Sequence, residues 1–237
     1  MKVKRKTSAV QRNIGRAELG SGMSRREQNK LEKLHRIKNA ARALFVSKGF
    51  DETTIREIAA AAEVGLGTVF VYAANKRDLL FLIFNDGLEE ITKKAEASVS
   101  KTAPLLDNLL NVFQCHYQFF ARQPALSRLV LREMTFYDSG IQARSFQKTR
   151  EALIELIADA VRLATSQKAV STTETPQFIG WVIFCIYQVE LRAWLSRNDI
   201  KIRGGLNHLR RALALFMEGI NSGNVATINA AASSGNS

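Results

Sequence analysis

This chain contains few of the proline and glycine residues that interrupt helices, and few of the cysteines that cross-link loops. Of its 237 residues, 3 are proline and 14 are glycine, so few positions would end a helix. We therefore expect an all-α fold without strands. The two cysteines, Cys115 and Cys185, lie in apolar helical runs. We interpret them as core thiols rather than a disulfide, which fits a reducing cytoplasm.

The sequence also lacks a targeting segment. The N-terminus is basic, but no apolar stretch follows it, so no secretory signal is predicted. The longest apolar run, at residues 181–195, is interrupted by Gln188, Glu190 and Arg192 and is expected to be too short and too polar to cross a bilayer. We expect a cytoplasmic protein that is not inserted in a membrane.

No pattern of catalytic residues is visible either. The three histidines, His35, His116 and His208, are scattered, and no metal-ligand spacing links them. There is no Gly-x-Ser-x-Gly motif, no phosphate-binding glycine loop and no paired nucleophile and base. We therefore expect neither an enzyme nor a resident metal or cofactor.

Positive charge, by contrast, is abundant. The formal net charge is +12, and residues 1–80 hold 17 Lys and Arg against 8 Asp and Glu, while the other 157 residues hold 17 against 14. A basic excess in the N-terminal third suits a polyanion such as DNA. A solvated surface or an anionic membrane would also accommodate it.

Capping boxes mark two helix starts in the first third of the chain. Residues 1–23 are basic and show little apolar periodicity, which predicts a flexible arm. Ser24 and Glu27 form one capping box, and Thr54 and Glu57 form another. Each pair can satisfy backbone donors at the start of a helix.

Glycine and asparagine mark the other boundaries of this region. Apolar residues recur at helical spacing until Gly49, which suits the left-handed position after a helix end. A tight turn is predicted at 63–67, a short helix at 68–72 and a longer helix capped by Asn75.

The remainder of the chain predicts helices to about residue 220. Pro104 and Pro124 suit first helical positions, and Thr175-Pro176 starts a further helix. The pair Gly204-Gly205 is expected to separate the last two helices. The tail at 221–237 is rich in Ser, Ala, Gly and Asn, which predicts disorder.

The most informative stretch reads TTIREIAAAAEVGLGTVFVYAANKRDLL, from Thr53 to Leu80. With the preceding long helix that ends in Lys48-Gly49-Phe50, it resembles the DNA-binding domain of TetR-family transcriptional regulators over residues 25–80. The resemblance implies an all-α, TetR-like fold. A three-helix helix-turn-helix DNA-binding domain would occupy 24–80, and a helical ligand-binding and dimerisation domain would occupy 81–220.

The resemblance also implies which residues meet DNA. The second helix would cross the backbone and the third would enter the major groove. Arg56 is the candidate for a bidentate guanine contact, while an exposed helix charge is its plain alternative. Tyr72 would grip phosphate or else pack in the core. The predicted DNA-binding residues are Thr54, Arg56, Gly65, Leu66, Gly67, Thr68, Val71, Tyr72 and Lys76.

Three positions depart from the usual pattern of the family. Glu63 stands where the turn commonly begins with glycine, Phe70 replaces a tyrosine whose hydroxyl meets phosphate, and Ala73 replaces an aromatic residue. Of the groove-facing residues, Leu66 and Val71 could contact thymine methyl groups. The recognition helix therefore offers few hydrogen bonds to bases.

We hypothesise that recognition depends on Arg56, on thymine contacts and on the basic arm. Such arms can enter a minor groove that A·T tracts narrow. Deleting residues 1–23 should lower operator affinity and flatten its salt dependence. A functionless tail would leave both unchanged.

The segment at 178–187 is apolar nearly all round, so it must be covered on several sides. A partner subunit would cover one face. The resemblance agrees, because in that family the last two long helices pair with their copies. We expect a homodimer and an approximately palindromic double-stranded DNA operator.

A pocket for a small-molecule effector is expected in the second half. Its candidate lining residues are Phe113, His116, Tyr117, Phe120, Arg132, Trp181 and Phe184, which would equally serve as plain core. The set favours an apolar or aromatic effector, and an arginine facing inward would favour an acidic one.

Together these features predict a DNA-binding transcriptional regulator of the repressor type, with operator affinity changed by an unidentified small molecule. The helix that begins at Lys76 joins the two domains and would transmit the change. The alternatives are an architectural or cell-division protein of the same fold without a ligand, an enzyme, and a basic membrane-surface protein.

Overall fold

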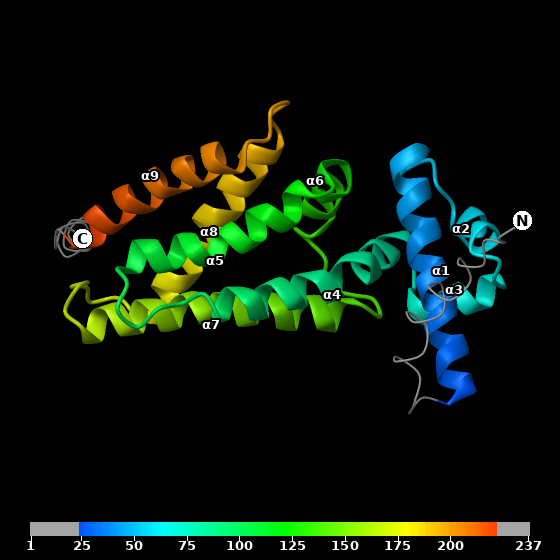
Figure 1. Ribbon diagram of the computed structural model, residues 1–237, viewed down its shortest axis with the longest axis horizontal. Helices are drawn as coiled ribbons and strands as arrows, with labels where there is room; N and C mark the ends of the chain where they lie inside the picture. Colours follow the sequence, from blue (N-terminus) through cyan, green and yellow to red (C-terminus); the bar gives the residue numbers. More distant parts are fainter. Residues whose placement is uncertain (1–23, 222–237) are drawn as a thin grey trace, which may run out of the picture.

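The computed structural model describes residues 24–221, and this described part is helical throughout, without strands. The helices are α1 (Arg25–Ser47), α2 (Ile55–Ala61), α3 (Leu66–Tyr72), α4 (Lys76–Glu96), α5 (Leu105–Ala121), α6 (Pro124–Glu133), α7 (Ala143–Ser166), α8 (Pro176–Leu195) and α9 (Ile202–Asn221). Figure 1 shows α1 to α3 at one end of an elongated molecule and α9 towards the other. The all-α prediction is confirmed, while the arm at 1–23 and the tail from 222 lie outside the described residues.

The predicted helix starts of the first domain are confirmed. The Ser24 and Thr54 hydroxyls accept hydrogen bonds from the backbone amides of Glu27 and Glu57, at 3.3 and 3.2 Å, and both capping boxes are complete. Gly49 follows the end of α1 with φ +96°. The hydrogen bond from Lys48 lowers the pKa of Glu57 to about 2 and ties α1 to α2.

The recognition helix begins earlier than the sequence predicts. α3 starts at Leu66 rather than at residue 68, because Gly65 takes the extended N-cap conformation. Glu63, where the family commonly has glycine, adopts φ +51°. A side chain in this left-handed region costs about 1–2 kcal/mol. Arg36 contacts the Glu63 carboxylate at 3.3 Å.

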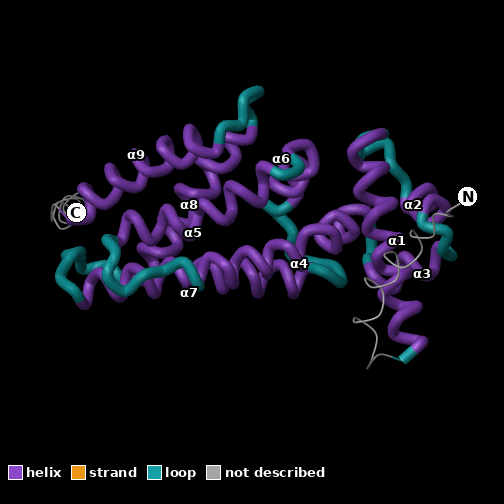
Figure 2. The backbone as a smooth tube through the Cα atoms, viewed as in Figure 1, coloured by secondary structure: helices purple, strands orange, loops and turns teal. Residues whose placement is uncertain are grey.

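Helix α4 contributes to the cores of both the N-terminal helix-turn-helix part and the larger helical part of the molecule. Twelve of its 21 residues are buried, and it packs against α1 on one side and against α5 and α7 on the other. Figure 2 shows α4 and α7 running side by side along the long axis. A rigid helix that contributes to both cores can carry a movement from one to the other. The predicted domain boundary at residue 80 falls inside this helix.

Helix α8 is a core helix of the second part. By length and composition, the 20 residues of α8 could cross a membrane. The prediction that the apolar run at 181–195 is too short and too polar to do so is therefore not upheld. In the fold, eight of its residues are buried, and it packs against α7 and α9. This packing accounts for its apolar character.

The prediction that Gly204-Gly205 separates two helices is wrong. Both glycines lie inside α9, which begins at Ile202. A Cβ atom at Gly205 would lie 2.6 Å from the Tyr117 ring and 2.7 Å from the Trp194 ring. Glycine is needed there for close helix packing rather than for a chain break.

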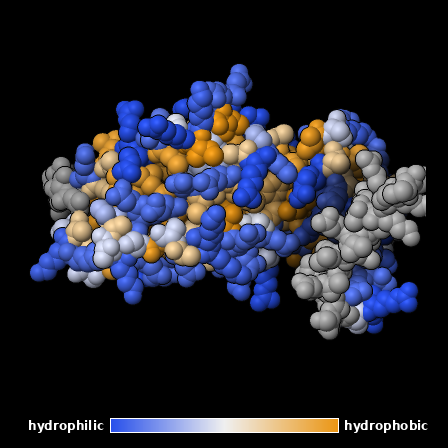
Figure 3. Space-filling view, viewed as in Figure 1, coloured by the Kyte–Doolittle hydropathy of each residue, from blue (hydrophilic) through white to orange (hydrophobic). Residues whose placement is uncertain are grey.

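Apolar side chains remain exposed on the last two helices. Leu215 on α9 is 73% exposed, and Val189, Phe178 and Trp181 on α8 are 64%, 50% and 48% exposed. Figure 3 shows apolar surface gathered over the C-terminal part on the face in view. Large exposed apolar patches are typical of interaction sites.

Candidate functional site

The end of the molecule formed by α2 and α3 carries the side chains predicted to read DNA bases (Figure 1). Arg56 is exposed on α2, and Val71 is 66% exposed on α3. Gly65 and Gly67 are exposed at the start of α3, whereas Leu66 packs partly on the core. Phe70, the departure from the family pattern, is 44% exposed. The surface therefore offers one long cation and several apolar contacts.

Other predicted DNA contacts have partners within the protein. The Tyr72 hydroxyl donates to the backbone oxygen of Lys30 at 3.2 Å, and the Lys76 ammonium donates to the backbone oxygen of Asp51 at 2.8 Å. The Thr54 hydroxyl caps α2. To bind DNA, these side chains would have to give up or share their hydrogen bonds within the protein and form new ones to DNA phosphates. Their DNA roles, and that of the partly buried Thr68, stay predictions.

A buried carboxylate joins the two parts at the first turn of α4. Asp78 is fully buried. Its Oδ2 accepts from the backbone amides of Ala74 and Ile141 at 2.8 and 2.9 Å. Its Oδ1 accepts from the amide of Gln142 at 2.9 Å and from the Tyr137 hydroxyl. The carboxylate is thus satisfied by four donors, as a buried charge requires.

The segment at 134–142, between α6 and α7, supplies most of those donors, and we call it the α6–α7 loop. Gly140 approaches Asp78 so closely that a Cβ would lie 2.6 Å from Oδ1, and it adopts φ +124°. The Gln142 amide group donates to the backbone oxygen of Tyr72, the last residue of α3, at 3.0 Å. Burial, followed by the hydrogen bond to Asp78, raises the pKa of Tyr137. The loop is therefore tied to the recognition helix as well as to α4.

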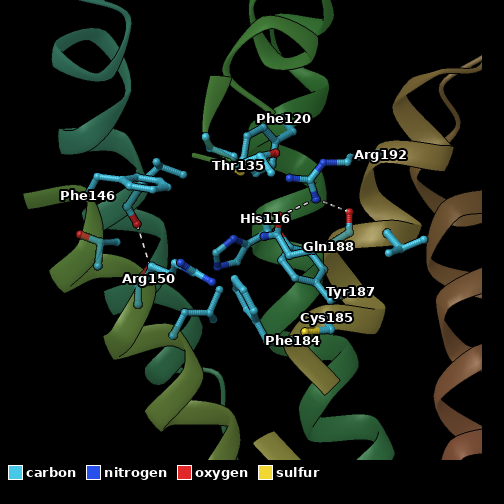
Figure 4. A pocket seen from close by; sticks show the side chains of 16 residues that line it. His116, Phe120, Thr135, Phe146, Arg150, Phe184, Cys185, Tyr187, Gln188 and Arg192 are labelled. Carbon is cyan, nitrogen blue, oxygen red and sulfur yellow. Dashed lines mark hydrogen bonds between the residues drawn. The ribbon is translucent and has the colours of Figure 1, made fainter. Parts of the chain in front are cut away.

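A cavity of about 290 Å³ lies among α4, α5, α7 and α8. Figure 4 shows side chains from several helices converging on it. The lining residues are Leu88, Thr92, His116, Phe120, Met134, Thr135, Phe146, Thr149, Arg150, Leu153, Phe184, Cys185, Tyr187, Gln188, Val189 and Arg192. Its wall is mostly apolar, and it includes α4 and the first residues of the α6–α7 loop.

Two arginines border this apolar cavity without a carboxylate partner among the described residues. Arg192 donates only to neutral oxygens: the backbone and side-chain oxygens of Gln188, each at 2.9 Å, and the backbone oxygen of Leu131 at 3.4 Å. Burial lowers the pKa of Arg192. The Arg150 guanidinium lies 5.5 Å from the centre of the Phe184 ring. The cavity thus has an uncompensated positive charge.

Three of the predicted pocket residues, His116, Phe120 and Phe184, do line the cavity. The other four do not, and these predictions are corrected here. Phe113 and Tyr117 are fully buried in the core behind it, where both rings lie against Tyr187.

Arg132 and Trp181 instead point to the outside of the fold. The Arg132 side chain is 55% exposed and pairs with Glu133 and Asp51. Trp181 is 48% exposed beside Phe178. Helical spacing brings residues to one face of a helix, but it does not say which neighbour that face meets.

Neither of the two arginines of the cavity is among the residues predicted from the sequence. Arg192 had a visible signal, because it interrupts the apolar run that became α8. Arg150 had none, since it lies on an ordinary amphipathic helix. The cysteines are free and half-buried, and Cys185 borders the cavity.

These features define a class of protein: a helix-turn-helix domain joined by a shared helix to a helical domain with a ligand-sized cavity. Residues 37–83 match the family model of bacterial regulatory proteins, tetR family. This segment is therefore a TetR-type DNA-binding domain.

Similar proteins come from several bacteria. The chain is 25% identical over 126 residues to a fatty acid metabolism regulator protein of Bacillus subtilis, covering 53% of this chain and 63% of that one. It is 25% identical over 185 residues to the transcriptional repressor KstR of Mycobacterium tuberculosis, covering 78% of each. Both relatives are regulators rather than enzymes.

Solved structures share the fold. FadR of Thermus thermophilus, a TetR-family transcriptional repressor determined in complex with lauroyl-CoA, superposes with a TM-score of 0.59 at 24% identity. The match covers 76% of this chain and 93% of that one. At this level of identity the likeness establishes the fold alone.

Proposed function

We propose that this protein is a transcriptional repressor that leaves its operator when an amphipathic anion, of the long-chain acyl-CoA class, binds the cavity. One observation carries the proposal: an apolar cavity with two unpaired arginines lies directly against α4, the helix shared with the DNA-binding domain.

The lining of the cavity supports this ligand class. An apolar wall favours an alkyl chain, which is worth about 0.8 kcal/mol for each buried CH₂ group. Exposed Arg150 and half-buried Arg192 favour a negative group at the other end of the ligand, because neither has a carboxylate partner among the described residues and each can form charge-assisted hydrogen bonds to an anion. Neither feature suits a polar neutral effector. The lauroyl-CoA bound by the Thermus thermophilus repressor has both parts.

The α6–α7 loop supports a route from the cavity to DNA. Met134 and Thr135 line the cavity, and the same loop binds Asp78 and, through Gln142, the end of α3. A ligand that displaces these first residues would move the loop and turn the recognition helix. Such a ligand changes DNA affinity only to the extent that it prefers one of the two arrangements.

The exposed apolar side chains of α8 and α9 support a homodimer. Val189, Trp181 and Leu215 lie on these two helices, which the sequence analysis assigns to the subunit interface. Two copies related by a two-fold axis would present two recognition helices to an approximately palindromic operator. Light scattering on the eluting protein should give twice the mass of the chain.

Operator release by an acyl-CoA tests the proposal. A duplex selected from a random DNA pool would be labelled, and its fluorescence anisotropy with the protein followed as lauroyl-CoA is added. We expect the operator affinity to fall at least tenfold, with free coenzyme A as the inactive control. Unchanged affinity with bound lauroyl-CoA would remove the regulatory claim and favour an architectural role.

Arg56 tests the DNA-binding surface. Replacing it with alanine should weaken operator binding about 10- to 100-fold, because a bidentate base contact is worth about 1–3 kcal/mol. Lys101, exposed in the loop between α4 and α5 and outside α8 and α9, gives the control K101A. Equal affinities for R56A and K101A would mean that Arg56 does not contact DNA.

A further inference from the structure

His116 is a polar side chain in the mostly apolar wall of the cavity. It lies on α5, is 3% exposed, and faces the space between Arg150 and Gln188 in Figure 4. Its Nε2 is buried without a hydrogen-bond partner in the described part of the chain. The imidazole lies edge-to-face against the Tyr187 ring, with centroids 5.6 Å apart.

Burial also fixes the charge of this imidazole. Desolvation lowers the pKa of His116 from 6.5 to about 4. The ring is therefore neutral near pH 7, with one N–H donor and one nitrogen acceptor. A neutral ring has no particular affinity for an anion, which the two arginines attract. It is suited to a neutral oxygen.

An unpartnered buried polar group is costly, at about 1–3 kcal/mol. A leucine of similar size would line an apolar cavity without that cost. A ligand that supplies the missing partner would recover the cost, and one that cannot would leave it. A hydroxyl group can both donate to and accept from the ring, while a keto oxygen accepts from its N–H. Rotation about χ2, which is a broad two-fold torsion, can turn either nitrogen to the cavity.

We infer that His116 selects, among amphipathic anions, those that carry a hydroxyl or keto oxygen on the alkyl chain. The inference rests on the proposed function, because it concerns the same cavity. It assigns His116 to specificity, whereas the arginines bind the negative group and the apolar wall binds the chain.

A matched ligand series tests this inference. Binding of lauroyl-CoA would be compared by calorimetry with that of hydroxylauroyl-CoA isomers that carry the hydroxyl near the thioester, in mid-chain or at the chain end. We expect at least one isomer to bind wild-type protein about tenfold more tightly than lauroyl-CoA, which corresponds to about 1.4 kcal/mol. Operator release should follow the same order.

Two variants separate recognition from packing. His116→Leu should reverse the preference, with lauroyl-CoA bound more tightly than by wild type and the isomer more weakly. His116→Gln retains a donor and an acceptor and should keep part of the preference. Circular dichroism and a melting curve would show that both variants fold, and ligand-free His116→Leu should melt no lower than wild type.

The outcomes distinguish this inference from the proposed function. If lauroyl-CoA binds and releases DNA but no isomer is preferred, the selective role of His116 is wrong and the proposed function stands. A preference that persists in His116→Leu also overturns the inference. If no member of the series binds, both are wrong.

Discussion

Two buried polar regions lie along α4, and they differ in how their polar groups are satisfied. At the first turn, Asp78 receives four hydrogen bonds and has no unmet acceptor. Further along, beside Leu88 and Thr92, the cavity holds His116 and Arg192. Among residues 24–221, one nitrogen of His116 has no hydrogen-bond partner and Arg192 has no carboxylate partner. A satisfied network fixes a structure, whereas an unsatisfied one leaves interactions for a ligand. We therefore interpret the first region as a fixed joint and propose the second as the binding site.

Removing the joint should have the largest effect. Asp78→Ala leaves up to four donors without their acceptor, and each unsatisfied donor costs about 1–3 kcal/mol. We expect a loss of at least about 3 kcal/mol in the free energy of unfolding, measured with urea. The control is Asp138→Ala, which alters an exposed residue of the same loop. Similar losses for both variants would contradict the role of Asp78.

The pH dependence of stability should show that His116 is buried as a neutral imidazole. The folded state lowers the pKa of His116 from 6.5 to about 4, so between these values the unfolded chain binds more protons. This contribution is complete above pH 6.5 and is lost as the pH falls towards 4. At pH 5 the loss relative to neutral pH should amount to about 2 kcal/mol. The stability of His116→Leu, measured by urea unfolding, should lack this part of the pH dependence. If the stability of wild type and of His116→Leu changed with pH in parallel, His116 would not be the cause.

Replacing Arg192 should lower the affinity for the ligand more than it lowers the stability of the fold. Arg192→Gln removes the half-buried positive charge but keeps a polar side chain. Acyl-CoA binding, measured by calorimetry, should weaken about tenfold, while ligand-free protein keeps its operator affinity. Lys101→Gln, which changes an exposed residue outside the cavity, is the control. If Arg192→Gln binds acyl-CoA as tightly as wild type does, the negative group lies elsewhere.

The smallest expected effect is that of removing a single hydrogen bond to Asp78. Tyr137→Phe removes one of the four donors to Asp78, while the ring can keep its stacking on Phe81, with centroids 3.6 Å apart. Loss of one hydrogen bond should lower stability by about 1 kcal/mol, as measured by urea unfolding. A loss as large as that of Asp78→Ala would mean that this one bond holds the joint together.

The sequence predicts the local features of this fold well. The capping boxes at Ser24 and Thr54 are confirmed because each depends on residues only three positions apart. The last helices are less predictable, since the Gly204-Gly205 pair favours a break that α9 does not contain. Their position inside α9 depends on contacts of Gly205 with rings on α5 and α8, which the sequence does not display.

The joint could not be predicted for the same reason. Asp78 reads as an ordinary acidic residue near a helix start, while Tyr137, Ile141 and Gln142 follow it by 59, 63 and 64 residues. The cavity was predicted in part. The apolar periodicity of α5 and α8 suggested His116, Phe120 and Phe184, but it also suggested residues that pack behind the wall or face outwards.

The most direct test of the account is the affinity of lauroyl-CoA for the protein with and without bound operator, measured by calorimetry on the full chain. The account links the cavity to the DNA-binding surface through α4 and the α6–α7 loop. Linkage then requires each ligand to weaken the other by the same factor. We predict that operator-bound protein binds lauroyl-CoA at least tenfold more weakly than free protein does. Equal affinity in the two states would contradict the link between the cavity and DNA.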